Sequence, residues 1–466
     1  MRTLAPPQVD LCDIQGNILL PYNMEYANHL FVHFDEAPAA REWLASLVDG
    51  VTTADPDPWR DGQKPGSTLN VAFTAAGLGA LGVPHDTMRT FSPEFRNGMM
   101  ASAQALGDKG PSDPARWDRG WEPGQVHAMV AVHSPSPEGV RRRCAQVGSA
   151  MRGRAVSELF SQPAARLDDN KEHFGFKDGF GQPWLDVPGV PHRPVPDHHN
   201  GQGTPDGKGG WRPVALGEFL LGHDDEEGIL PEAPYPELLA RNGTYLVYRK
   251  LRQDVDAFRR YIDSQAQLLG VEAERVAAAM VGRWRDGSPL RLSPEKPDPD
   301  LGKNEDLNND FTYREDPRGF GCPIGAHIRR ANPRDALGFE DRRRHALLVS
   351  RHRMIRRGIP YGEPFPKGSS DRGLLFMAAM ACLKRQFEFV QGQWMNDGNI
   401  FHLGADRDPF AGDQRGEGKM TIQGCPPKLI SGIPPLVVTR GGEYFFKPGI
   451  AALRWLAAGD RAGSVS

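Results

Sequence analysis

The chain has 466 residues and a formal net charge of -3 at pH 7. That length exceeds one ordinary hydrophobic core, so we expect two domains or one duplicated domain. A chain without a positive excess does not suit a phosphate backbone, and no segment approaches the roughly 20 apolar residues that a membrane span requires, so neither nucleic acid nor a membrane is expected as a partner.

The five cysteines are odd in number, lie far apart and form no Cys-x-x-Cys motif. This spacing indicates neither a disulfide framework nor a thiolate metal site. The first residues contain neither the apolar stretch of a secretory signal nor a twin arginine. We therefore expect reduced thiols and a cytoplasmic protein.

Strand and helix patterns alternate through the first half of the chain, which we place at residues 1–213. Residues 28–34 alternate like a strand, and residues 38–47 bring apolar side chains to one face of a helix. The same order returns with strands at 68–74 and 127–133 and helices at 75–81 and 137–150. A long loop rich in Gly, Pro and Asp, residues 181–213, then leads to the second half.

The second half, residues 214–466, repeats this order. Its elements are a strand at 243–250, a helix at 255–267, a strand at 374–379 with a helical run to residue 390, a strand at 442–446 and a helix at 450–456. We therefore predict an α+β fold of two duplicated, ferredoxin-like halves with antiparallel sheets.

A glycine-rich loop near the end of the first half holds a single carboxylate. In the stretch Phe174-Gly175-Phe176-Lys177-Asp178-Gly179, two glycines bracket an aspartate in a G-x-x-D-G pattern. Glycine lets the backbone turn tightly and approach a flat ligand, while Asp178 is held facing that ligand. An aspartate that only caps its own turn is the alternative interpretation.

A histidine among small and apolar neighbours marks the second half. His327 follows Cys322-Pro323-Ile324-Gly325-Ala326 and is followed closely by Arg329 and Arg330. A histidine that ligates haem iron must stay neutral, which apolar packing and an acceptor for its second nitrogen favour, and a neighbouring arginine can pair with a haem propionate. A core histidine beside solvated arginines is the alternative.

Together these two motifs match a known family. The chain resembles the dye-decolourising (DyP-type) peroxidases, in their longer branch, whose motifs are a G-x-x-D-G loop with a catalytic distal aspartate and a downstream proximal histidine. The likeness extends over nearly the whole chain and includes segments 13–19, 219–222, 242–247, 357–362, 373–376 and 442–446. It implies the same duplicated fold, with one haem b per chain bound in the second half.

The resemblance also implies roles on the proximal side of the haem. His327 would be the iron ligand, and Arg330 or Arg329 would pair with a propionate. The second N–H of His327 needs a carboxylate acceptor, for which the sequence leaves two candidates, Glu388 and Asp397. His173, just before the G-x-x-D-G loop, is interpreted as a structural or propionate-side residue.

On the distal side, Asp178 would be the acid-base group. The segment 354–362 matches the family segment that carries a distal arginine, and counting back from its Pro-x-Gly end places that role on Arg356 rather than Arg357. Leu374 and Phe376, two apart on a strand, would point to one face and match the family's apolar pair that lines the distal pocket.

These assignments predict a haem peroxidase that reduces hydrogen peroxide and oxidises bulky organic reductants such as dyes and phenolic compounds. Splitting peroxide requires a proton shuttle and a fixed positive charge, which Asp178 and Arg356 would supply. A non-enzymatic haem-binding or haem-delivery protein is the alternative, and a haem-free scaffold is the third interpretation. The sequence leaves open the reductant, any surface electron-relay residue and the oligomeric state.

Overall fold

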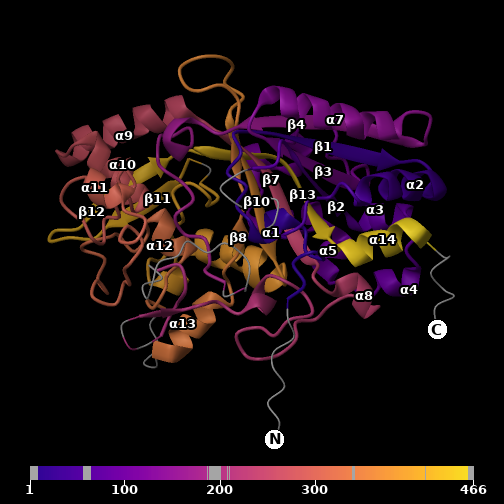
Figure 1. Ribbon diagram of the computed structural model, residues 1–466. Coiled ribbons are helices and arrows are strands. Elements are labelled where there is room, and N and C mark those ends of the chain that lie inside the picture. The colour runs from indigo at the N-terminus through magenta and orange to yellow at the C-terminus, as the bar shows by residue number, and fades with distance from the viewer. Residues whose placement is uncertain are drawn as a thin grey trace, which may run out of the picture.

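The computed structural model is built around one antiparallel sheet to which both halves of the chain contribute (Figure 1). It describes residues 9–55, 64–185, 187, 201–206, 208, 210–337, 342–414 and 416–459. The strand order is β4-β1-β3-β2-β13-β7-β10-β8, and β9 also pairs with β10. All neighbouring strands of this sheet run antiparallel, as predicted.

The first half supplies four strands in the β-α-β-β-α-β order of a ferredoxin-like unit. The bounds are β1 Tyr26–Phe34, α2 Ala37–Val48, β2 Thr68–Phe73, β3 Ala128–Ser134, α7 Pro137–Met151 and β4 Val156–Ala165. Helix α2 has Pro38 in its first turn, where a missing N–H costs nothing, and buries Trp43, Leu44 and Leu47 as predicted.

The second half repeats this arrangement with its second strand divided in two. The bounds are β7 Thr244–Gln253, α9 Val255–Leu269, β8 Ile355–Arg356, β9 Ile359–Tyr361, β10 Gly373–Met380, the π-helical segments Lys384–Glu388 and Val390–Met395, β13 Val437–Lys447 and α14 Ile450–Ala458. The spatial order β13-β7-β10-β8 matches that of the first half. The duplicated α+β fold is therefore confirmed, while the division at residue 213 stays a prediction.

Shorter elements complete the two sides of the molecule. In Figure 1, α9, α10, α12 and the hairpin β11–β12 lie on one side, and α2, α3, α7 and α14 lie on the other. Helix α14 comes from the second half yet packs against α2 of the first. The remaining bounds are α1 Gly16–Leu19, α3 Ala75–Ala80, α4 His85–Met88, α5 Pro93–Asn97, α6 Ala103–Leu106, β5 Thr204–Pro205, β6 Trp211–Arg212, α8 Glu237–Ala240, α10 Ala273–Val281, α11 Pro299–Lys303, α12 His327–Ala331, α13 Arg342–Ser350, β11 Gly418–Ile422 and β12 Lys428–Ile433.

The two halves share one hydrophobic core. Strands β2 and β13 meet where Phe73 pairs with Phe446. The ring of Phe31 on β1 packs edge-on against Tyr248 on β7, with centroids 5.1 Å apart. All four rings are fully buried, and each buried Phe contributes roughly 1.5–3 kcal/mol relative to exposure. The halves therefore cannot separate without exposing this core.

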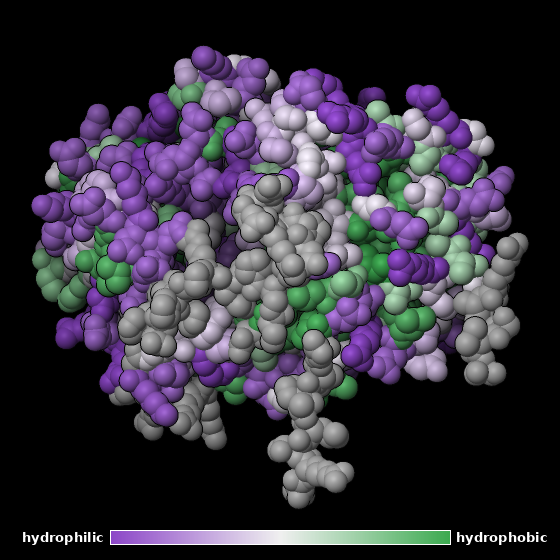
Figure 2. All heavy atoms as spheres, in the orientation of Figure 1, coloured by the Kyte–Doolittle hydropathy of each residue, from purple (hydrophilic) through white to green (hydrophobic). Residues whose placement is uncertain are grey.

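The face of the molecule seen in Figure 2 is mostly hydrophilic, with smaller apolar areas among the polar side chains. Within the described part of the chain, no helix is long and apolar enough to cross a membrane. The large apolar side chains instead fill clusters between the sheet and the helices.

A histidine in β1 is buried among aromatic rings. The ring of His29 is completely buried against His133 and Tyr248, with centroids 5.7 and 5.6 Å away. Neither of its ring nitrogens has a hydrogen-bond partner among the described residues. Burial lowers the pKa of His29 well below its usual value, and burial lowers the pKa of His133 to about 4. The folded protein therefore keeps both rings neutral.

We predict that stability falls as the pH drops from about 6.5 towards about 4, because the unfolded chain takes up protons on these histidines while the folded protein does not. The substitution His29→Phe keeps a ring of similar size without a titratable nitrogen, so it should reduce this loss. Calorimetric melting temperatures at about pH 7.5 and about pH 5 measure the effect. His85→Phe, on the exposed helix α4, should behave as the parent does. Equal losses for His29→Phe and the parent would contradict the prediction.

Candidate active site

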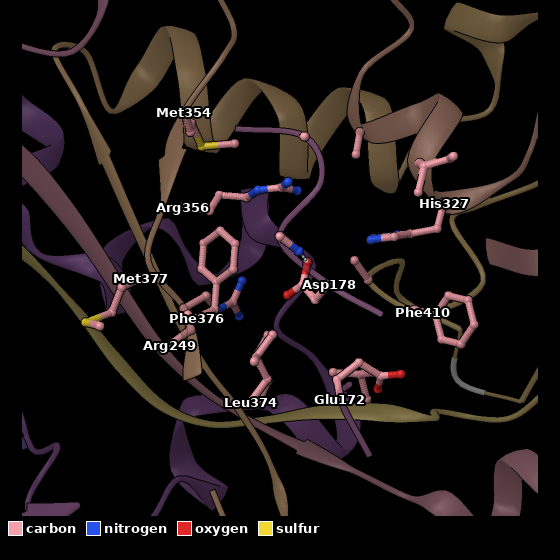
Figure 3. Close-up of a pocket in the computed structure, with 18 of the residues that line it drawn as sticks. Glu172, Asp178, Arg249, His327, Met354, Arg356, Leu374, Phe376, Met377 and Phe410 are labelled. Carbon is pink, nitrogen blue, oxygen red and sulfur yellow. Dashed lines mark hydrogen bonds between the residues drawn. The ribbon is translucent and has the colours of Figure 1, made fainter. Parts of the chain in front are cut away.

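A cavity of about 560 Å³ is lined by side chains from both halves of the chain. This volume lies in the range of about 300–1,000 Å³ that is typical of ligand sites. Figure 3 shows His327 entering from one side, while Asp178, Arg356 and Phe376 face it. The structure therefore brings together residues that lie far apart in the sequence.

The loop that carries Asp178 folds back as a tight turn. The Asp178 N–H donates to the Asn170 carbonyl oxygen over 3.0 Å. Gly175 and Gly179 have φ angles of 94° and 96°, a region that side chains with a Cβ rarely adopt. The Asp178 Oδ1 accepts from the Gly179 N–H at 2.6 Å, and Oδ2 has no protein partner among the described residues. Asp178 thus caps its own turn and still presents a carboxylate oxygen to the cavity.

Arg356 presents its guanidinium to the same cavity. Its backbone N–H donates to Gln182 Oε1 at 2.9 Å, and β8 pairs with β10 through Ala378. Its guanidinium makes no hydrogen bond or ion pair with any described residue. The backbone of Gly181 runs close to this guanidinium: a Cβ atom at residue 181 would lie 3.1 Å from the Arg356 Nη2. A loop of the first half and a strand of the second thus bring Asp178 and Arg356 to one side of the cavity.

The neighbouring arginine is used by the fold instead. The Arg357 guanidinium donates to the carbonyl oxygens of Asn17, Ile18 and Leu19, at 2.9, 2.9 and 3.2 Å. These are carbonyls of α1 that the helix itself leaves without partners. Burial lowers the pKa of Arg357 to about 10. Arg357 therefore anchors α1, and this geometry favours Arg356 for the cavity.

Leu374 and Phe376 place apolar surface on the same side as Asp178. Both line the cavity, and they alternate along β10 with Leu375 and Met377, which are almost completely buried. Side chains two apart on a strand share a face, as predicted. Apolar walls keep water away and strengthen the electrostatic effect of the charged groups beside them.

On the opposite side of the cavity, His327 begins α12 and is held by a buried aspartate. Its Nδ1 lies 2.9 and 3.1 Å from the two carboxylate oxygens of Asp408, which is completely buried and also accepts from the N–H groups of Phe410 and Ala411. Burial lowers the pKa of His327, but the Asp408 carboxylate outweighs this effect and leaves that pKa raised. The Nε2 atom has no hydrogen-bond partner among the described residues and faces the cavity.

Both sequence-based candidates for this acceptor were wrong. Glu388 accepts from the Tyr444 hydroxyl at 2.8 Å, and Asp397 accepts a backbone N–H two residues further along at 2.8 Å. The actual acceptor, Asp408, lies 81 residues from His327. Its backbone N–H donates to the Met395 carbonyl oxygen at the end of the π-helical turns, over 2.8 Å. Tertiary structure, and not the local sequence, brings this carboxylate to the histidine.

Arg329 and Arg330 do not line the cavity. Arg329 donates to Asp316 Oδ2 at 3.0 Å. Arg330 donates to the carbonyl oxygens of Trp394 and Asp406, each at 2.7 Å. Both side chains are buried behind the cavity wall, because the turns of α12 direct them away from it. Neither is placed for the propionate pairing predicted from the sequence.

Besides Arg249, which pairs with Asp108, three other buried arginines line the cavity: Arg283, Arg334 and Arg353. They donate to carbonyl and amide oxygens, for example from Arg334 to Phe311 at 2.6 Å and from Arg353 to Gln202 at 3.1 Å, and none makes an ion pair among the described residues. Burial and then the charge of Arg334 lower the pKa of Arg283 and that of Arg353, each to about 9. Buried like charges without carboxylate partners favour an anionic ligand.

These features fit an iron porphyrin. Such a group needs a neutral nitrogen ligand, apolar walls and cations for two propionates. His327 offers the nitrogen through its Nε2 atom, and Leu374 and Phe376 form apolar walls. The cations are the three buried arginines. The residues present therefore suit the haem that the sequence motifs predict.

Sequence reasoning missed Asp408 and all three cavity arginines. Only Arg334 had a local signal, since it lies seven residues after His327 within the same motif. His173 does not line the cavity, and its Nε2 lies 2.8 Å from the Tyr361 carbonyl oxygen, which agrees with a structural role.

Comparisons with known proteins add independent support. Residues 13–166 match the DyP dimeric alpha+beta barrel domain, and residues 236–403 match the Dyp-type peroxidase C-terminal domain. The dye-decolorizing peroxidase msp1 of Mycetinis scorodonius is 30% identical over 96% of this chain and 87% of its own. The structure of an ancestral D-type dye decolorizing peroxidase superposes with a TM-score of 0.81, at 30% identity, over 98% of this chain and 100% of that one. A dye-decolorizing peroxidase in complex with 2,6-dimethoxyphenol also gives a TM-score of 0.81, at 26% identity, over 97% and 100%.

The fold and these matches define a haem peroxidase. The chain belongs to the dye-decolourising (DyP-type) peroxidases, because the family domains cover more than half of it and a relative is 30% identical over 96% of it. The family, the fold class and the enzyme class predicted from the sequence are thereby confirmed.

We predict that Asp408→Asn weakens haem retention by about 10- to 100-fold and raises the haem reduction potential, because a neutral amide makes His327 a poorer electron donor. Haem transfer to excess apomyoglobin and spectroelectrochemical titration measure the two effects. Asp397→Asn, at a position that the sequence favoured equally, serves as the matched control and should keep the parent values. Unchanged retention and potential in Asp408→Asn would contradict the proximal role of this aspartate.

Proposed function

We propose that this protein uses hydrogen peroxide to oxidise bulky organic reductants such as dyes and phenolic compounds, with one haem b per chain held by His327. The observation that carries this proposal is the arrangement of a carboxylate, Asp178, and an uncommitted cation, Arg356, across the cavity from the free nitrogen of His327. The bound haem supplies the iron that exchanges electrons with peroxide and with the reductant.

The two distal residues, Asp178 and Arg356, have different roles in this reaction. Asp178 takes a proton from hydrogen peroxide and returns it to the departing oxygen, because its free Oδ2 faces the cavity. Arg356 stabilises the negative charge that develops as the two oxygens separate, and a guanidinium holds its charge at any working pH. Arg283, Arg334 and Arg353 are the buried cations that would pair with the propionates.

The substrate class is carried over from the relatives. One relative is named a dye-decolorizing peroxidase, and another was solved with 2,6-dimethoxyphenol. A cytoplasmic location, predicted from the cysteine pattern, is part of the same proposal. A haem-storage or haem-delivery protein would require neither a proton shuttle nor an unpaired distal cation, so Asp178 and Arg356 favour the enzyme.

We predict that the haem-loaded protein shows a Soret band that changes on adding one equivalent of hydrogen peroxide and returns on adding 2,6-dimethoxyphenol. Rapid-scan absorption spectroscopy records both changes. A Soret band that ignores peroxide would favour haem binding or delivery, and no Soret band after reconstitution would favour a haem-free protein.

The two distal residues should differ in what their loss does. Arg356→Leu should slow the peroxide-dependent Soret change about 100- to 1000-fold across the accessible pH range, since one preorganised charge is worth roughly 3–4 kcal/mol. Asp178→Asn should slow the change and alter its dependence on pH, because a proton carrier is lost. Stopped-flow mixing over a range of pH measures both.

The control for charge loss is Arg454→Leu, on the exposed side of α14, where the arginine pairs with Asp49 and with no other described residue. Arg357→Leu is unsuitable, because it would release the carbonyls of α1. The division of roles is refuted if Asp178→Asn keeps the parent's rate and pH profile, or if Arg356→Leu and Arg454→Leu react equally fast.

A further inference from the structure

A second carboxylate lies inside the turn that carries Asp178. The Glu172 side chain accepts three hydrogen bonds, from the Phe174 N–H at 2.8 Å, the Phe176 N–H at 2.9 Å and Gln253 Nε2 at 2.5 Å. The Glu172 backbone N–H also donates to the Phe176 carbonyl oxygen, over 3.0 Å. The Glu172 side chain therefore lies inside the turn and stabilises it by hydrogen bonds. Gly175 is the residue of this turn that has a positive φ angle.

The same carboxylate joins the loop to the other half of the chain. Gln253 is the last residue of β7, the strand that pairs with β10 and β13. Its bond to Glu172 ties the turn of the first half to the sheet that also positions Arg356 through β10. Both Glu172 and Gln253 line the cavity, and Figure 3 shows the Glu172 carboxylate in the same pocket as Asp178.

Glu172 has donors around it but no compensating cation. It makes no ion pair among the described residues, although Lys171 and Lys177 stand on the same turn and pair with Asp169. Burial and then the nearby Asp178 charge raise the pKa of Glu172 despite its three donors. Placing a partly buried carboxylate where no cation compensates its charge destabilises the folded protein. If this side chain had only to close the turn, a neutral hydrogen-bond acceptor would do so at a smaller free-energy cost.

We infer that Glu172 is a positioning residue for Asp178: by gathering two backbone N–H groups and the Gln253 amide, it fixes the turn that holds the Asp178 carboxylate over the cavity. The inference rests on the proposed role of Asp178. It assigns no contact with substrate to Glu172 itself.

The test is a double-mutant cycle on the haem-loaded protein. Glu172→Gln puts an NH2 group against N–H donors, so at least one of them loses its acceptor. In the otherwise unchanged protein this should slow the peroxide-dependent Soret change about 10- to 100-fold, since small displacements of catalytic groups are that costly. In the Asp178→Asn background the same change should slow it by about twofold at most, because Glu172 acts only through Asp178.

Glu443→Gln is the matched control. Glu443 is likewise a partly buried carboxylate that accepts two backbone N–H groups, from Met99 and Tyr444 at 2.7 Å each, but it does not line the cavity. Its loss should lower the melting temperature and leave the rate unchanged. Hydrogen exchange of the peptide around residues 172–178 should quicken in Glu172→Gln only.

Each outcome separates this inference from the proposed function. Equal, additive slowing by Glu172→Gln in both backgrounds, or no slowing in either, would overturn the positioning role. A parent-like rate in Asp178→Asn alone would instead overturn the proposed function. Should Glu172→Gln fail to fold, Gln253→Met removes one of the three bonds and should show a smaller slowing with the same dependence on Asp178.

Discussion

The hydrogen bond between Asp408 and His327 Nδ1 decides what the cavity can hold. It places the proton of a neutral ring on Nδ1 and leaves Nε2 facing the cavity. Asp408 is held in turn by backbone N–H groups and by the Met395 carbonyl oxygen at the end of the π-helical turns. Such turns are uncommon and recur at functional sites, and the Met395 carbonyl can accept from Asp408 because the last turn of a helix leaves its carbonyls without internal partners.

The side of the cavity that carries Asp178 and Arg356 depends on how the two halves of the chain pair in one sheet. Asp178 comes from a loop of the first half and Arg356 from a short strand of the second, and they meet because the halves form one sheet. Arg356 and Arg357 are adjacent and both line the cavity, yet the Arg357 guanidinium is bound to the carbonyls of α1 and that of Arg356 has no partner among the described residues. A one-residue slip of β8 would exchange them, so the sheet register selects which arginine serves the site.

The same dependence explains what the sequence predicted and what it did not. The G-x-x-D-G loop and His327 were found because glycine conformations and apolar flanks are local properties, and the duplicated fold was found from its periodicity. Arg329 and Arg330 were misplaced because closeness to His327 in sequence was taken as closeness in space, although successive helical residues point about 100° apart. Asp408, Arg283 and Arg353 carry no local signal, since only tertiary packing brings them to the cavity.

The buried charges of the site destabilise the folded protein when no ligand is bound. Arg283, Arg334 and Arg353 are buried together against carbonyl oxygens, and their mutual repulsion joins the loss of hydration in opposing the charged forms. An anionic group bound among them removes that repulsion and adds charge-assisted hydrogen bonds. Because such a ligand binds the folded state and not the unfolded chain, its binding free energy is also stabilising free energy. A cofactor held by these arginines would therefore couple its own retention to the folding of the protein.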